Sequence, residues 1–316
     1  MPYTAWENTS SSFKAKITGK LLGDGCITKQ KGRKPRFQFI HTARDYSWGN
    51  YCYQKLKSDI PLNPPSFRKT YDKRLVKGYS LSYQVQSKTC DTITYLRKQW
   101  YPVKRKVIPF SLLNRYFNEE SLAWWYMDDG HLKVKSNKPE KIILSTESFL
   151  VVEIEQLISF LDKKYNLRFS VDKQSRIVLY DQYQIYYFLH LIEPYLHHSM
   201  YRKSILKCKC LEYITSRRTT IYLPAVINIE KPTNEINEAL TMLSDLINIF
   251  KHGSFYNKYG DLISHNINGQ KSYQIVISEK NMESLTFLKQ NIGLTFSQLT
   301  YLCLLKLNKS KKDSST

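Results

Sequence analysis

The sequence predicts an α+β protein made of two pseudo-symmetric halves, each with the element order αββαββα, followed by a small, mainly helical C-terminal extension. The first observation behind this fold class is a motif that occurs twice. The second is that helix-like and strand-like periodicities follow both copies in the same order. The third is a change of composition after Arg217, where the excess of positive charge falls. We therefore expect domains at residues 1–110, 111–216 and 217–316.

The repeated motif is ITGKLLGDGCI at 17–27 and LAWWYMDDGHL at 122–132. Each copy is an apolar, helix-like run that ends in Asp-Gly and passes into a strand. We expect Gly25 and Gly130 to adopt the left-handed conformation that ends many helices. Gly19 and Gly23, four residues apart, would let the two motif helices pack closely side by side.

The remaining elements of the halves follow the motifs in matching order. In the first half we expect strands at 27–34 and 36–41, a helix at 45–60 and a second hairpin at 66–85. The second half repeats this order with strands at 132–138 and 141–146, a helix at 148–165 and a hairpin at 168–180. A further helix and a basic segment close each half, at 103–109 and 200–205.

The C-terminal extension, residues 217–316, is an appended α/β domain without a recognisable motif, so its role stays open. Pro224 and Lys231-Pro232 indicate a linker. Helices are expected at 234–250, 281–290 and 296–306, and a strand at 273–278. The polar residues 309–316 are expected to be disordered.

Composition limits the function classes. The chain has 316 residues and a net charge of +21, which calls for a polyanionic partner. Residues 1–216 hold 36 of the basic and 19 of the acidic residues, so the polyanion site belongs there. No leader pattern and no apolar run of about 18 residues occurs, which argues against secretion and a membrane partner. Scattered cysteines and abundant Lys, Asn, Ile and Tyr suggest an organelle matrix, with an organelle gene in a mitochondrion or chloroplast, or a bacterial cytoplasm.

Asp24 and Asp129 suggest a metal centre. An aspartate in the last turn of a helix opposes the helix dipole at a cost of about 0.3–1 kcal/mol. If the motif helices pack side by side, both carboxylates converge and only cations could stabilise them. Together with oxygen atoms of Gly23 and Asp128, they favour Mg²⁺ and the hydrolysis of phosphodiesters by a metal-bound water.

Basic residues on the hairpins would form a positive, saddle-shaped band of antiparallel strands. Such strands can enter the major groove of DNA and read bases with alternate side chains. As single residues they could equally be solvated charges, so the signal is the group. The expected DNA contacts are Lys29, Lys31, Arg33, Lys34, Arg36, Gln38, Arg68, Lys69, Lys73, Arg74, Lys133, Lys135, Lys138, Lys141, Arg168, Lys173 and Arg176.

With both motifs in view, residues 13–206 resemble the single-chain LAGLIDADG homing endonucleases, especially the type encoded in a mitochondrial large-rRNA intron. The nine-residue motifs align at 17–25 and 122–130, with an aspartate at the eighth position of each. The resemblance implies that Asp24 and Asp129 bind metal. It also implies that Lys106 and Lys203 are the basic residues beside the metals, with Arg202 as an alternative to Lys203.

The implied activity is double-strand cleavage of DNA at a long recognition site, by a monomer. The resemblance implies about two or three Mg²⁺ ions shared at the helix interface, with Mn²⁺ able to substitute. Lys20 in the first motif, Trp124 at a small-residue position of the second, and the C-terminal extension depart from the family pattern.

Two other functions stay open. The same scaffold could act as an RNA maturase, a splicing cofactor that binds group I intron RNA. A packaging protein that binds nucleic acid without sequence preference is the third reading, and it predicts equal affinity for random DNA.

Overall fold

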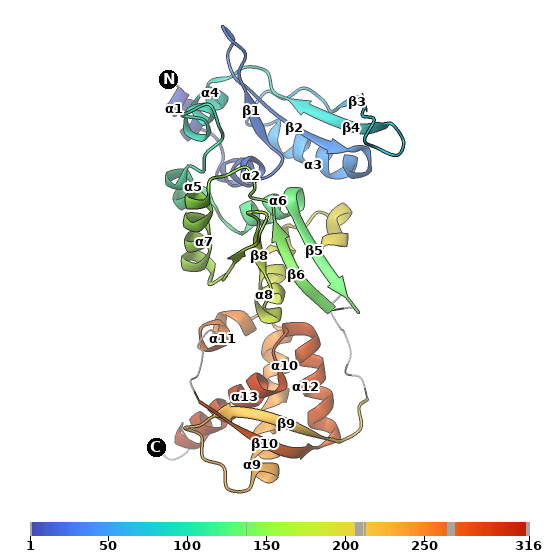
Figure 1. Cartoon of the computed structure of the whole chain (residues 1–316). Coiled ribbons are helices and arrows are strands. Elements are labelled where there is room, and N and C mark those ends of the chain that lie inside the picture. Colours follow the sequence, from blue (N-terminus) through green and yellow to red (C-terminus); the bar gives the residue numbers. More distant parts are fainter. Residues whose placement is uncertain (1, 137, 206–210, 212, 264–268, 314–316) are drawn as a thin grey trace. The chain divides into compact units, whose positions relative to one another are not determined.

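The computed structural model describes the chain except for residues 1, 137, 206–210, 212, 264–268 and 314–316. The described residues divide into two compact units, one within 2–180 and 188–205 and the other within 181–187 and 211–313. The first unit contains both copies of the motif, in α2 and α6 (Figure 1). It also contains all five tryptophans of the chain.

Each half of the first unit contains a four-stranded antiparallel sheet, and the two sheets have the same strand order, β1-β2-β4-β3 and β5-β6-β8-β7. The pairing registers match as well, because Cys26 faces Gln38 in the first half and His131 faces Ile143 in the second. The first half comprises α1 (Pro2–Glu7), α2 (Ser11–Leu22), β1 (Cys26–Thr28), β2 (Arg36–Thr42), α3 (Tyr46–Leu56), β3 (Ser66–Tyr71), β4 (Tyr79–Gln86) and α4 (Asp91–Trp100).

The second half repeats this plan, which confirms the predicted αββαββα duplication. Its long helix α7 and the shorter α8 occupy the places of α3 and α4, while α5 precedes the motif helix. The elements are α5 (Phe110–Tyr116), α6 (Glu119–Asp129), β5 (Gly130–Lys135), β6 (Lys138–Leu144), α7 (Val151–Tyr165), β7 (Ser170–Val171), β8 (Ile177–Leu179), α8 (Gln182–Ile192) and the 3-10 helix η3 (His198–Lys203).

The motif helices α2 and α6 lie beside each other at the centre of the first unit (Figure 1). Ser10 caps α2 by accepting a hydrogen bond from the Phe13 N–H, and Asn118 caps α6 in the same way through Ser121. Helix α6 is buried all round, including Trp124 and Trp125. These tryptophans are therefore core residues and not a surface for stacking bases.

Two glycines allow the close contact of the motif helices, as predicted. A Cβ on Gly19 would lie 2.2 Å from the backbone oxygen of Ser121, and a Cβ on Gly23 would lie 2.7 Å from Cβ of Asp128. The hydroxyl of Ser121 also donates to the carbonyl of Ala15 at 2.8 Å. Backbone therefore packs on backbone, and no larger residue fits without moving a helix.

The expected left-handed caps are wrong. Gly130 has φ −81° and ψ 149°, and Gly25 is not among the positive-φ glycines. Both glycines are needed for space: a Cβ on Gly25 would lie 2.5 Å from the Lys20 carbonyl oxygen, and one on Gly130 would lie 2.0 Å from the Tyr126 ring. The chain turns so sharply after each motif helix that it passes directly over the preceding turn.

Strand β1 ends at Thr28, six residues before the expected end of that strand. The lysines that follow lie in a loop, where Gly32 has a φ of +73° that interrupts an extended strand. Strand β2 alternates as expected, with Phe37, Phe39 and His41 buried and Arg36 and Ile40 exposed. One face of this sheet thus packs on helices while the other is open.

The second unit has one two-stranded sheet among its described residues, and its core is apolar. Strand β9 falls where we expected a linker, α11 was not expected, and the single helix expected at 234–250 is two helices joined by a 3-10 turn. Helix α13 continues to Asp313, whereas we expected disorder from residue 309, and 314–316 lie outside the described part. The elements are β9 (Arg217–Pro224), α9 (Pro232–Ala239), η4 (Leu240–Met242), α10 (Leu243–Lys251), α11 (Phe255–Ile263), β10 (Gln270–Ile277), α12 (Glu279–Ile292) and α13 (Phe296–Asp313).

A search of the described residues for a membrane-spanning helix finds none that is long and apolar enough.

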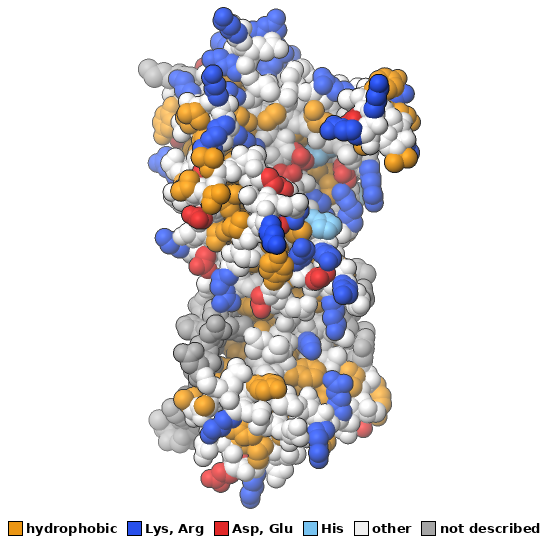
Figure 2. Space-filling view, in the orientation of Figure 1, with side chains coloured by type: hydrophobic (Ala, Val, Ile, Leu, Met, Phe, Trp, Pro, Cys, Tyr) orange, Lys and Arg blue, Asp and Glu red, His pale blue; other side chains and the backbone are white. Residues whose placement is uncertain are grey.

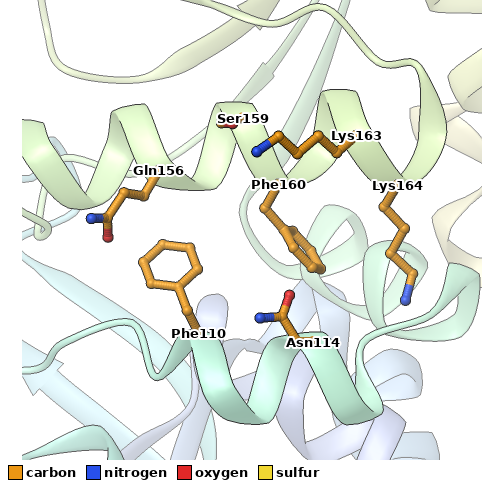
Figure 3. Close-up of a pocket in the computed structure, with 7 residues that line it drawn as sticks. All are labelled: Phe110, Asn114, Gln156, Ser159, Phe160, Lys163 and Lys164. Carbon is orange, nitrogen blue, oxygen red and sulfur yellow. The ribbon is translucent and has the colours of Figure 1, made fainter.

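A hollow of about 570 Å³ lies between α5 and α7. Figure 3 shows Phe110 and Asn114 reaching into it from α5, opposite side chains of α7. Its lining contains no carboxylate, thiol or imidazole that could bind a metal, and no residue of the two motifs. The lining residues are Phe110, Asn114, Gln156, Ser159, Phe160, Lys163 and Lys164.

The helix contact yields a stability prediction. We expect Gly19→Val to lower the free energy of unfolding by about 3 kcal/mol or more, because the clashing atom is backbone that cannot rotate away. Ser11→Val, which adds the same side chain at an exposed position of α2, should change it by less than about 0.5 kcal/mol. Urea unfolding followed by tryptophan fluorescence measures this, since all five tryptophans lie in the first unit. Equal effects of the two variants would contradict the close packing.

Candidate active site

The aspartates of the two motifs come together at one end of the α2–α6 pair. Asp24 directly follows the C-terminal end of α2, and its backbone N–H donates to Oδ2 of Asp128 at 3.2 Å. Asp129 is the last residue of α6. Three carboxylates from two halves of the chain therefore lie within one small region.

Burial and repulsion by neighbouring carboxylates make Asp24 and Asp129 weaker acids in the folded chain. The pKa of Asp24 is raised to about 7, first by burial and then by the negative charge of Asp128, with a contribution from Asp129. The pKa of Asp129 is raised to about 6 by burial and, again, by Asp128. The site thus has a surplus of negative charge that a bound cation would relieve.

A lysine lies at the end of each motif helix. Nζ of Lys106 donates to the carbonyl oxygens of Gly25 at 3.0 Å and Gly23 at 3.3 Å. Nζ of Lys203 donates to those of Met127 at 2.7 Å and Asp128 at 3.1 Å. These are the oxygens that a helix end leaves without intrahelical partners, and a cation there also interacts favourably with the helix dipole.

The surroundings of Lys106 and Lys203 lower the pKa of both amines. Burial lowers the pKa of Lys106 to about 8, although the charge of Asp129 opposes that change. Burial also lowers the pKa of Lys203, against the charge of Asp128. Both amines therefore release a proton more easily than an exposed lysine does.

The guanidinium of Arg202 does not contact the end of a motif helix in the described contacts. Its Nη2 forms an ion pair with Oδ1 of Asp45 at 2.8 Å, and its Nη1 donates to the carbonyl of Ser199. Of the two alternatives for the second basic residue, the structure puts Lys203 at the helix end.

A buried polar cluster that sequence reasoning missed adjoins the aspartates. Lys20, with a side-chain exposure of 0%, donates to Oδ1 of Asp128 at 2.8 Å, and Trp48 Nε1 donates to the same oxygen at 2.8 Å. Lys20 Nζ also lies 2.7 Å from Nε2 of His41. The other ring nitrogen of His41 lies 3.3 Å from Oδ2 of Asp24. One sequence signal points to His41: it continues the buried alternation of Phe37 and Phe39 with a polar residue.

Burial and neighbouring charges determine the protonation of Lys20 and His41. Burial alone would lower the pKa of Lys20, but the carboxylates of Asp128 and Asp24 together hold it above its usual value. Burial and the charge of Lys20 lower the pKa of His41 to about 2, so the imidazole is neutral. Asp128 and Lys20 therefore form a buried ion pair beside a neutral histidine.

Ligand atoms of Asp24, His41 and Asp128 all lie within 4.8 Å of one another, a spacing that could suit a metal ion. The ammonium of Lys20, however, already contacts both His41 and Asp128. The carboxylate of Asp128 is also wholly buried and bonded to Lys20, Trp48 and the Asp24 N–H. Its side chain is thus engaged, and only its backbone carbonyl could serve an ion.

The carboxylates of Asp24 and Asp129 remain for a cation. The carbonyls of Gly23 and Asp128 already accept from Lys106 and Lys203, so each could bind an ion only through its second lone pair. These hard donors fit a divalent cation of the Mg²⁺ class. Burial is the main cause of the raised pKa of both carboxyl groups and the charge of Asp128 is the next, and a bound cation would oppose both effects.

The expected DNA contacts lie on the hairpins of both halves, and nearly all are exposed. Figure 2 shows Lys and Arg side chains gathered over the hairpin tips of the first unit. Three have acidic partners in their own hairpins: Arg74 with Asp72, Lys133 with Glu140, and Arg176 with Asp172.

The remaining predicted contacts are distributed as follows. Lys29, Lys31, Arg33 and Lys34 are in the β1–β2 loop, Arg36 and Gln38 on β2, Arg68 and Lys69 on β3, Lys73 in the β3–β4 turn, Lys135 on β5, Lys138 and Lys141 on β6, and Arg168 and Lys173 beside β7. Within this set, the amide oxygen of Gln38 accepts from Gln84 and Gln86, which fixes its side chain on the open face of the sheet.

Comparison with known proteins agrees with this architecture. The family model of the LAGLIDADG DNA endonuclease family matches residues 14–188. Because that span exceeds half of the chain, the chain belongs to the LAGLIDADG DNA endonuclease family. The resemblance inferred from the two motifs is confirmed.

Three curated relatives match parts of this chain. An uncharacterized protein of Methanocaldococcus jannaschii is 30% identical over 208 residues, which cover 65% of this chain and 76% of that protein. A probable intron-encoded endonuclease of Wickerhamomyces canadensis is 27% identical and covers 60% and 83%, respectively. The cytochrome b mRNA maturase bI2 of Debaryomyces hansenii is 28% identical and covers 53% and 61%.

Among solved structures, the homing endonuclease I-WcaI bound to its DNA recognition sequence has a TM-score of 0.54 and 24% identity. The match covers 64% of this chain and 90% of that chain. It supports the fold of the two halves.

The raised pKa values predict how stability depends on pH without metal. The folded chain holds the protons of Asp24 and Asp129 more tightly than the unfolded chain, where the usual value is 3.8. This stabilising contribution is fully present below about pH 4 and is lost as the pH rises through about 6 and 7. In EDTA, Asp24→Asn should therefore gain stability relative to the unmodified chain between pH 5 and 8, by about 1–2 kcal/mol after solvent screening.

Urea unfolding across that pH range checks this prediction, with Asp162→Asn, an exposed position on α7, as the matched control. For the control, the free energy of unfolding should differ from that of the unmodified chain by the same amount at every pH. If the difference for Asp24→Asn is also independent of pH, the pKa of Asp24 is not raised in the folded chain.

Proposed function

We propose that this chain is a site-specific DNA endonuclease of the homing type, which hydrolyses one phosphodiester in each strand of a long recognition site. The observation that carries the proposal is the pair of motif helices in contact at Gly19, with an aspartate and a lysine at the same end of each. Membership of the LAGLIDADG DNA endonuclease family supports it.

Each half would serve one DNA strand. Asp24 and Asp129 would hold Mg²⁺, with Mn²⁺ as a substitute, and the backbone oxygens of Gly23 and Asp128 would complete the ligand set. When bound, about two or three ions would supply a Lewis acid and an activated water for attack on phosphorus. In this proposal the protein acts as a monomer. Residues 1–216 would hold the duplex across both sheets.

Lys106 and Lys203 would act beside these aspartates. Their ammonium groups are fixed by two or more carbonyl oxygens each, so they approach a phosphate without further ordering. A positive charge there would stabilise the charge that develops on the phosphoryl oxygens. The lowered pKa of Lys106, about 8, would also let it move a proton near neutral pH.

DNA would bind along the open faces of the two sheets. Alternate side chains of β2, such as Arg36 and Gln38, face the same side and could read base edges in the major groove. The loop lysines would contact phosphates. For the host compartment, we keep the proposal of an organelle matrix or a bacterial cytoplasm.

A second candidate function is RNA maturation, since one relative is named a cytochrome b mRNA maturase. In that role the chain would bind group I intron RNA, and the second unit could supply part of the surface. Equal rescue of splicing by the unmodified chain and by Asp24→Asn, in a strain lacking the protein, would favour this function.

Cleavage of the flanking genomic sequence, joined without the insert that carries the gene, tests the endonuclease proposal. With Mg²⁺, we expect Asp24→Asn and Asp129→Asn each to lower double-strand cleavage by at least about 10²-fold, because each removes a charged ligand while keeping its size. DNA affinity should be retained. Asp162→Asn is the control, and undiminished cleavage by either site variant would exclude the assignment.

Salt dependence tests the β1–β2 loop. We expect the double variant Lys29→Gln and Lys31→Gln to reduce the slope of log affinity against log salt by about 2, because two phosphate contacts are lost. Lys251→Gln with Lys258→Gln, in the second unit, removes the same charge and should leave the slope unchanged. Fluorescence anisotropy at several salt concentrations measures both, and equal slopes for all three proteins would show that the loop does not contact DNA.

A further inference from the structure

The buried cluster beside Asp24 exists in only one half. With an offset of 105 residues between the motifs, Lys20 corresponds to Trp125, and His41 corresponds to Thr146. Thr146, which follows β6, donates its hydroxyl hydrogen to the carbonyl of Ser175 in the β7–β8 turn at 2.6 Å, so its side chain is bonded within the second half. The described contacts thus give Asp24 a neighbour that has no counterpart at the equivalent position of the second half.

Hydrogen-bond chemistry fixes the state of His41. A lysine ammonium can only donate, so Nε2 of His41, 2.7 Å from Lys20 Nζ, must accept. The neutral ring therefore carries its proton on Nδ1, which lies 3.3 Å from Oδ2 of Asp24. Lys20 therefore donates to both Asp128 and His41, and His41 directs its own N–H toward Asp24.

The cluster has little freedom to rearrange. Lys20 Nζ lies 4.3 Å from the centre of the Phe39 ring, and its side chain is fully buried. His41 is buried against Gly49, where an added Cβ would lie 3.2 Å from the imidazole. Trp48 donates to the same Asp128 oxygen as Lys20 does. A carboxylate that faces this ring therefore faces a fixed donor.

We propose that His41 is a positioning residue for one of the two strand cleavages: Lys20, anchored by Asp128 of the other motif helix, holds its Nδ1–H toward Asp24 and so orients that carboxylate. This inference rests on the proposed nuclease function. The arrangement is one-sided, so the strand served by Asp24 depends on His41 and the strand served by Asp129 does not.

The histidine variants separate orientation from packing. His41→Phe keeps a ring but removes the donor, whereas the amide nitrogen of His41→Asn can replace Nδ1–H. On a nicking assay with each strand labelled, we expect His41→Phe to slow the cutting of one strand by about 10-fold or more, so that a single nicked duplex accumulates. His41→Asn should restore most of that rate. Equal slowing of both strands, or no rescue by Asn, would overturn the proposal.

Two measurements do not depend on cleavage. In the metal-free full chain, ¹⁵N NMR of the histidine side chains should show His41 with protonated Nδ1 and unprotonated Nε2 at pH 7. Calorimetric titration with Mg²⁺ alone should show weaker binding to His41→Phe than to His41→Asn. A ring protonated on Nε2, or on both nitrogens, would exclude the arrangement, as would equal Mg²⁺ affinity.

These results also distinguish the two proposals. If the unmodified chain cuts no DNA while NMR shows the Nδ1–H form, the proposed function fails and the orientation of Asp24 stands. If the chain cuts both strands but His41 has the other tautomer, only the positioning role fails. A shift of the His41 nitrogen signals to a metal-bound form on addition of Mg²⁺ would make His41 a ligand and overturn its positioning role.

Discussion

The contact between the two motif helices is the constraint on which the rest of the first unit depends. At Gly19 the helices approach so closely that Ser121 of α6 can hydrogen bond to the backbone of α2. That contact fixes where both helices end, and hence where Asp24 and Asp129 lie. Strand β5 follows α6 directly and β1 begins after a short turn at the end of α2, so the same contact sets the relation of the two sheets to the candidate site.

The electrostatics at this end follow from the crowding. Two negative helix ends and three carboxylates meet there. Three lysines from different segments of the chain offset part of this negative charge. Lys106 and Lys203 bind the helix-end carbonyls, whereas Lys20 neutralises Asp128 from inside the interface. What remains uncompensated is on Asp24 and Asp129, which are the two groups that a metal would need.

Much of this arrangement could be predicted from sequence, because the duplication places equivalent residues at equal spacing. The order of elements and the positions of Asp24 and Asp129 at helix ends follow from the repeat, and the close helix contact follows from the spacing of Gly19 and Gly23 in the first motif. The Lys20–Asp128 pair could not be predicted, since its residues are 108 apart and belong to different halves. The left-handed conformation predicted for Gly25 and Gly130 was wrong for a different reason. Close neighbouring atoms, and not a positive φ angle, exclude a side chain at both positions.

The buried Lys20–Asp128 pair has a consequence for how such a chain can be rearranged by duplication or splitting. Two copies of the first half, assembled alone, would bring two lysines into their shared interface with no carboxylate at the position of Asp128. Two copies of the second half would bury two such aspartates without an ammonium. Burying an uncompensated charge costs several kcal/mol, so neither half makes a good homodimer. The ion pair therefore makes each half selective for the other.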